Sequence, residues 1–176
     1  WAPATPEVIS AMSGLCAGLE SLRLCISSPY ALPARHYDGY ASPVSSYFTA
    51  VASLVEGCSC LQSLDLTNAA VSGRAILALA SLPLKTLCLR NPRFEDDVMG
   101  TVVPFSHFCQ KVKTLRSFSW SESGSQPGSG LQLKDAMVWA IGSYMLPHLT
   151  SLSLKSLHVQ HFALLELAYG LSFAPG

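Results

Sequence analysis

Charge is scarce in this sequence. Only 12% of its 176 residues are Asp, Glu, Lys or Arg, whereas about 25% is usual for a soluble domain. Lys plus Arg and Asp plus Glu both number 11, so the formal net charge is zero. Two explanations of the low charge stay open: partners cover much of the surface, or the surface is rich in Ser, Thr and Gly. Without an excess of basic residues, bulk charge does not favour nucleic acid as a partner. A net charge of zero predicts poor solubility for the isolated chain, which favours a protein that is built into a larger assembly.

Long apolar runs and a disulfide framework are also lacking. No run approaches the roughly 18 apolar residues of a membrane span, so we expect no transmembrane segment. The cysteines are scattered through apolar segments, which predicts buried free thiols in a reducing intracellular compartment, the cytoplasm or, as the alternative, an organelle reached by import. The sequence opens at Trp1 without a signal-peptide pattern, so we expect a fragment or part of a larger chain. The six cysteines are Cys16, Cys25, Cys58, Cys60, Cys88 and Cys109.

What the sequence does contain is one hexapeptide pattern repeated five times: Leu, any residue, Ser or Thr, Leu or Phe, any residue, Leu or Trp. This is the strand signature of leucine-rich repeats, whose period is about 20–29 residues. Only the second unit, with 23 residues to the next copy (84 minus 61), falls in that range, so the others carry insertions. The copies span Leu19–Leu24, Leu61–Leu66, Leu84–Leu89, Leu115–Trp120 and Leu149–Leu154.

The segments between the copies predict helices. Thr5-Pro6 and Ser42-Pro43 each place a capping side chain before a proline at the first helical position. Since no strand-helix unit buries its apolar face alone, the units must stack. We therefore predict an α/β leucine-rich repeat solenoid of about five repeats, with a curved parallel sheet on the concave side and helices on the convex side. Residues 1–176 form one domain, with insertions at 27–42 and 121–130.

Two groups of residues are candidates for binding a partner. Side chains that alternate with the buried leucines face outward on the concave sheet, either as a binding groove or simply as small residues that let strands pack. The insertion over 27–42 combines a cation, an imidazole, a carboxylate and phenols, either as a contact surface or as an ordinary surface loop. The sheet candidates are Arg23, Asp65, Thr67, Cys88, Arg90, Ser119, Ser153 and Lys155, and the loop candidates are Tyr30, Arg35, His36, Tyr37, Asp38 and Tyr40.

Segment 57–68, Gly-Cys-Ser-Cys-Leu-Gln-Ser-Leu-Asp-Leu-Thr-Asn, resembles the cysteine-containing leucine-rich repeats in the substrate-binding half of F-box adaptor proteins. Val71-Ser72-Gly73 and segment 76–80 look like that family's turn and helix, and Asn68 falls where the family places its turn asparagine. The resemblance covers about one repeat closely and the others in general form. It implies protein recognition without catalytic residues, and a substrate-recognition domain of an F-box type ubiquitin-ligase adaptor as an alternative function.

Three motifs that might carry chemistry have simpler structural explanations. Cys58-Ser59-Cys60 lacks the second pair of ligands that a zinc site needs. His158 and His161 lack a third ligand, and the Gly-Ser run over 124–130 lacks the Gly-Lys-Ser/Thr ending of a phosphate-binding loop. We therefore predict no enzyme, no cofactor, no metal and no small-molecule substrate. The predicted function is a non-enzymatic protein-protein interaction or scaffold module, as a subunit or domain of a larger complex.

Overall fold

The five hexapeptides form five strands of one parallel sheet. The computed structural model describes residues 4–26, 43–94, 98–122, 131–157 and 159–172. The sheet has the strand order β1-β2-β4-β6-β7, and each strand begins at the Ser or Thr of its hexapeptide. The strands are β1 (Ser21–Cys25), β2 (Ser63–Thr67), β4 (Thr86–Arg90), β6 (Ser117–Ser121) and β7 (Ser151–Lys155).

The strands pair without any shift of register. Leu22, Leu64, Leu87, Phe118 and Leu152 are successive partners across the sheet, and so are Leu24, Leu66, Leu89, Trp120 and Leu154. These two columns are buried from β1 to β6, while the pair on the edge strand β7 is half-buried. Since alternate side chains of a strand point to opposite faces, one face of the sheet is apolar and the other carries the residues in between. The predicted parallel sheet and its inward columns are therefore confirmed.

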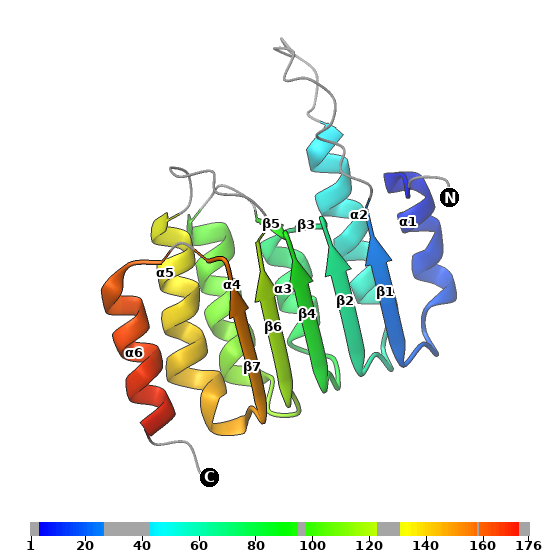
Figure 1. Cartoon of the computed structure of the whole chain (residues 1–176). Coiled ribbons are helices and arrows are strands. Elements are labelled where there is room, and N and C mark those ends of the chain that lie inside the picture. The colour runs from blue at the N-terminus through cyan, green and yellow to red at the C-terminus, as the bar shows by residue number, and fades with distance from the viewer. Residues whose placement is uncertain (1–3, 27–42, 95–97, 123–130, 158, 173–176) are drawn as a thin grey trace.

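The helices form a second layer along one face of the sheet (Figure 1). Consecutive helices pack side by side in chain order, so the helical layer follows the same sequence as the strands. Two short strands, β3 (Ala70–Val71) and β5 (Arg93–Phe94), pair in parallel beyond the ends of β2 and β4. The helical elements are α1 (Pro6–Met12), η1 (Ser13–Leu15), α2 (Pro43–Gly57), α3 (Gly73–Leu79), α4 (Val98–Lys111), α5 (Leu131–Ala140), η3 (Ile141–Met145), η4 (Leu146–His148) and α6 (His161–Ser172).

Capping residues fix where the helices begin. The Thr5 side chain accepts a hydrogen bond from the Val8 N–H with Pro6 at the first helical position, as the sequence predicts. Ser72 caps α3 in the same way through the Ala75 N–H, at 3.2 Å. The ends are less predictable: α1 stops at Met12, and a 3₁₀ turn carries the chain only to Leu15. Ser121, expected to open the insertion at 121–130, instead ends strand β6.

Asparagines hold the turns that follow β2 and β4. Asn68 and Asn91 both have positive φ, 54° and 47°, a left-handed conformation that asparagine tolerates better than most residues. The Asn68 amide donates to the Ile26 carbonyl at 3.2 Å, and the Asn91 amide donates to Asn68 Oδ1 at 3.2 Å. These bonds join three neighbouring units at the same turn, so they reinforce the register that the apolar columns set.

Aromatic side chains replace leucine in the fourth unit. Phe118 and Trp120 occupy the two column positions of β6 and are fully buried. Phe94 packs edge-on against Trp120 at a centroid distance of 5.5 Å, and Phe105 of α4 lies 6.5 Å from it. The larger rings of Phe118 and Trp120 fill the space between β6 and α4. The column positions therefore accept larger side chains without a change of register.

The close approach of α3 to α4 generates a stability prediction. A Cβ at Gly73 would lie 2.0 Å from the Gly100 carbonyl oxygen and 3.0 Å from Cγ of Pro104. We expect Gly73→Ala to lower the free energy of unfolding by about 1–3 kcal/mol, because the two helices must move apart. Gly14→Ala is the matched control, since a Cβ there meets nothing within 4 Å. Urea denaturation measures both variants, and an equal loss in the two would contradict the prediction.

Candidate functional site

All eight sheet candidates lie on the same face of the sheet, opposite the helices. Register places Arg23, Asp65, Cys88, Ser119 and Ser153 in one row across the strands. Thr67, Arg90 and Lys155 belong to the next row, two residues further along the strands. All eight are half-buried or exposed, in contrast to the buried apolar columns of β1, β2, β4 and β6. We refer to the outward side of the five strands as the open face.

Three strands of the open face are tied together by a cluster of charges. Oδ2 of Asp65 lies 3.3 Å from Nε of Arg23 and 3.2 Å from Nη2 of Arg90. The Arg90 Nε–H also donates to Sγ of Cys88 at 3.3 Å. This hydrogen bond, together with the charge of Asp65, raises the pKa of Arg90. The cluster is therefore a fixed arrangement of charge in an otherwise small and polar surface.

Elsewhere the open face presents hydroxyl groups. Ser119 and Ser153 continue the row of Asp65 and Cys88, and Ser117 and Ser121 flank them on β6. These serines are half-buried, so their small side chains lie at the surface of the sheet. Such a surface offers hydrogen bonds and charge for recognition, and it offers no nucleophile-base pair for catalysis within the part of the chain that the structure describes.

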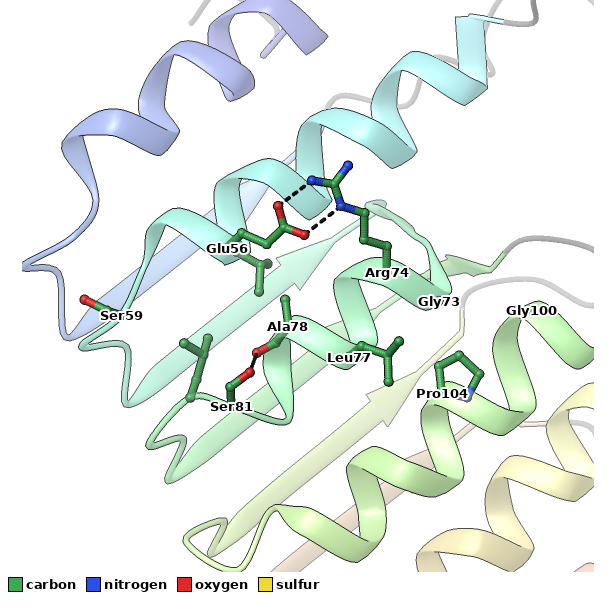
Figure 2. Close-up of a pocket in the computed structure, with 11 residues that line it drawn as sticks. Glu56, Ser59, Gly73, Arg74, Leu77, Ala78, Ser81, Gly100 and Pro104 are labelled. Carbon is green, nitrogen blue, oxygen red and sulfur yellow. Dashed lines mark hydrogen bonds and ion pairs between the residues drawn. The ribbon is translucent and has the colours of Figure 1, made fainter.

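A second candidate site is a groove on the helical side. The short helix α3 lies between the longer α2 and α4, and a hollow of about 610 Å³ opens above it (Figure 2). Leu77 is 46% exposed at its floor. The groove is lined by Val55, Glu56, Ser59, Gly73, Arg74, Leu77, Ala78, Ser81, Leu82, Gly100 and Pro104.

The polar groups of the groove already have partners. Arg74 meets Glu56 in a two-pronged ion pair, Nε to Oε1 at 2.6 Å and Nη2 to Oε2 at 2.6 Å (Figure 2). The hydrogen bonds from Arg74 lower the pKa of Glu56. The hydroxyls of Ser59 and Ser81 donate to the backbone carbonyls of Ala17 and Ala78, both at 3.1 Å. The groove therefore offers mainly apolar contact.

The sequence analysis did not predict this groove, although the spacing of the hexapeptides contained the signal. The second unit is the shortest of the series, and its helix α3 has 7 residues, against 15 in α2 and 14 in α4. A short helix between two longer ones cannot fill the layer, so a hollow is left along it, from Gly73 to Leu82. Repeat length, read unit by unit, would have indicated the position.

The six cysteines are free, but they are not all buried as the sequence analysis expected. Cys16, Cys58 and Cys109 are buried, Cys88 is half-buried, and Cys25 and Cys60 are exposed. Cys25 is the last residue of β1 on the open face, where alternation turns its side chain outward. Burial raises the pKa of Cys58 to about 12, and the neighbouring Cys16 thiol contributes to this shift. Burial also raises the pKa of Cys109.

The loop candidates Tyr30, Arg35, His36, Tyr37, Asp38 and Tyr40 lie outside the described residues, as does His158. Within the described ranges, no three His, Cys, Asp or Glu side chains gather in a group that could hold a metal ion. None of the helices described is both long and apolar enough to cross a membrane.

Comparison with protein-family models and with curated proteins gave no match. Among solved structures, the tropomodulin C-terminal domain of Caenorhabditis elegans is similar, with a TM-score of 0.54 over 95% of this chain and 91% of that chain. The sequences are 13% identical, so the likeness concerns the fold alone. The fold of this chain is mixed α/β, with a five-stranded parallel sheet and helices. Its overall fold is similar to that of the tropomodulin domain.

Thiol accessibility tests the placement of the open face. We expect iodoacetamide to alkylate Cys25 and Cys60 of the folded protein first, because their thiols are exposed and the thiolate is the reactive form. Cys16, Cys58 and Cys109 should react only after unfolding in urea, which is the internal control. Mass spectrometry of the digested protein identifies the labelled peptides. Rapid native labelling of Cys58 or Cys109 would contradict the described packing.

Proposed function

We propose that this chain is a leucine-rich repeat module that binds another protein through its open face and performs no catalysis. Five in-register strands with a repeated apolar pattern support the repeat assignment. The likeness of the fold to that of the tropomodulin domain agrees with this assignment. In this proposal the units stack as a solenoid, with the open face on its concave side and the helices on its convex side.

One observation carries the proposal: a whole face of the sheet is left uncovered by the described residues, and it presents mainly hydroxyls and charges. In parallel sheets, both faces are usually buried beneath helices. Here the helices take one face, and outward side chains such as Arg23 and Lys155 stay exposed on the other. A sheet face that keeps hydroxyls, thiols and charges available suits the recognition of a second chain.

The remaining expectations from the sequence stay predictions. The role as part of an F-box type adaptor rests on the resemblance of segment 57–68, and nothing in the geometry favours it over a general scaffold role. We likewise propose that the chain has no enzymatic activity, lies inside the cell and belongs to a larger complex.

Photo-crosslinking at two positions tests which side of the molecule binds. Benzoylphenylalanine is placed at Ser119, in the middle row of the open face on β6, or at Leu77, in the floor of the groove, and the chain is expressed in the cells of its own organism. We expect one partner to crosslink at position 119 and not at position 77, because partner contacts fall on the open face. Crosslinks at position 77 alone would make the groove the binding site and overturn the proposal.

A substitution gives the quantitative counterpart with the partner so identified. Ser119→Trp should weaken its binding at least tenfold, because the indole stands over the open face where small side chains allowed close approach. Leu77→Ser is the control and should leave the affinity unchanged. We expect both variants to remain folded because neither position belongs to the buried columns. Circular dichroism checks this expectation.

A further inference from the structure

The open face carries an excess of positive charge that the whole chain does not have. Its fifteen outward positions, three on each strand, include three cations, Arg23, Arg90 and Lys155, and one anion, Asp65. Three positive charges minus one negative charge leave +2, whereas the formal net charge of the full chain is zero. The compensating negative charge therefore lies elsewhere on the molecule.

The single carboxylate is also the least accessible member of the charge cluster. The side chain of Asp65 is 19% exposed, against 69% for Arg23 and 46% for Arg90. Both guanidiniums converge on the same oxygen, Oδ2, so one negative charge is shared by two positive charges. An approaching chain consequently meets the two arginines and not the aspartate between them.

The position of the arginines is fixed by the sheet. Arg23 stands directly beside Asp65 in the ladder, and Arg90 is on the strand at its other side, two residues further along. The hydrogen bond to Cys88 holds the Arg90 side chain against its own strand. A guanidinium that is already oriented loses less conformational entropy when it binds a carboxylate, and it recognises that group through its planar fork of donors.

We infer that the segment bound by the open face is an acidic, extended stretch of protein whose carboxylates contact Arg23 and Arg90, with Lys155 as a further contact. This inference rests on the proposed function of the open face and names the chemistry of its partner. Three cations are too few for the phosphate neutralisation that gives tight binding to nucleic acid. The hydroxyls between them suit the backbone and side chains of a peptide, and small residues let it lie close to the sheet.

Model peptides test the inference directly. Fluorescence anisotropy measures the affinity of the full chain for fluorescein-labelled deca-glutamate, deca-glutamine and deca-lysine peptides and for a ten-nucleotide thymidine strand, at low ionic strength. We expect binding of deca-glutamate alone, weakened by added salt because exposed charges are screened. No binding of deca-glutamate would overturn the inference. Equal binding of the thymidine strand would also overturn it, because the face would then attract any polyanion without specificity.

Matched variants locate the contact. The double variant Arg23→Gln/Arg90→Gln should bind deca-glutamate about two- to thirtyfold more weakly, the fold-change that corresponds to about 0.2–1 kcal/mol for each exposed ion pair. Asp65→Asn should bind it more tightly, because the competing internal carboxylate is removed. Arg74→Gln is the control, since Arg74 belongs to the helical side and pairs with Glu56. Equal losses in Arg74→Gln and in the double variant, or a loss in Asp65→Asn, would overturn the assignment.

The two proposals fail in different ways. If the natural partner crosslinks at position 119 through a segment without acidic residues, the acidic specificity is wrong and the open face remains the binding site. If deca-glutamate binds as expected but the natural partner crosslinks only at position 77, the proposed function is wrong.

Discussion

The rest of this structure depends on the burial of two columns of apolar side chains that run across the strands of the sheet. Each strand contributes two inward side chains, and neighbouring strands and the helices in front of them cover those side chains. Fully burying one leucine side chain contributes about 1.5–3 kcal/mol, so a shift of register by one residue, which turns the columns outward, is strongly disfavoured. On the edge strand β7, which pairs with β6 alone, Leu152 and Leu154 are only half-buried.

The same constraint creates the open face. When the leucines are locked in register, the residues between them are aligned in rows, whatever their chemistry. Asp65 meets Arg23 because both are the middle residues of paired strands, and Arg90 reaches it from the next strand. The charge cluster therefore forms on regular strands and requires no special backbone geometry. The groove on the helical side has a different origin, a difference in helix length, and its ion pair is satisfied internally.

Local patterns in the sequence were sufficient for the strands and insufficient for the helical layer. The hexapeptide predicts the five strands of the main sheet because period-2 alternation is local to the pattern, but it does not predict the short strands β3 and β5. Helix ends depend on tertiary contacts as well as on local sequence, and the capping pattern that sets the start of α1 does not set its end at Met12. Asp135 shows the limit most clearly: it is buried in α5 and accepts a hydrogen bond from the backbone N–H of Gln160 at 2.7 Å, 25 residues away. No spacing rule connects these two positions.

The energetics of the open face determine what kind of recognition it supports. Each exposed arginine contributes only about 0.2–1 kcal/mol to an ion pair, and hydrogen bonds from hydroxyls replace bonds to water with a net gain of about 1 kcal/mol. No single residue on this face is therefore a strong anchor. A partner must contact several strands at once to bind tightly, and the unbroken register is what places those contacts in rows. Loss of one core leucine would for this reason disturb recognition at a distance, by misaligning the rows instead of removing a contact.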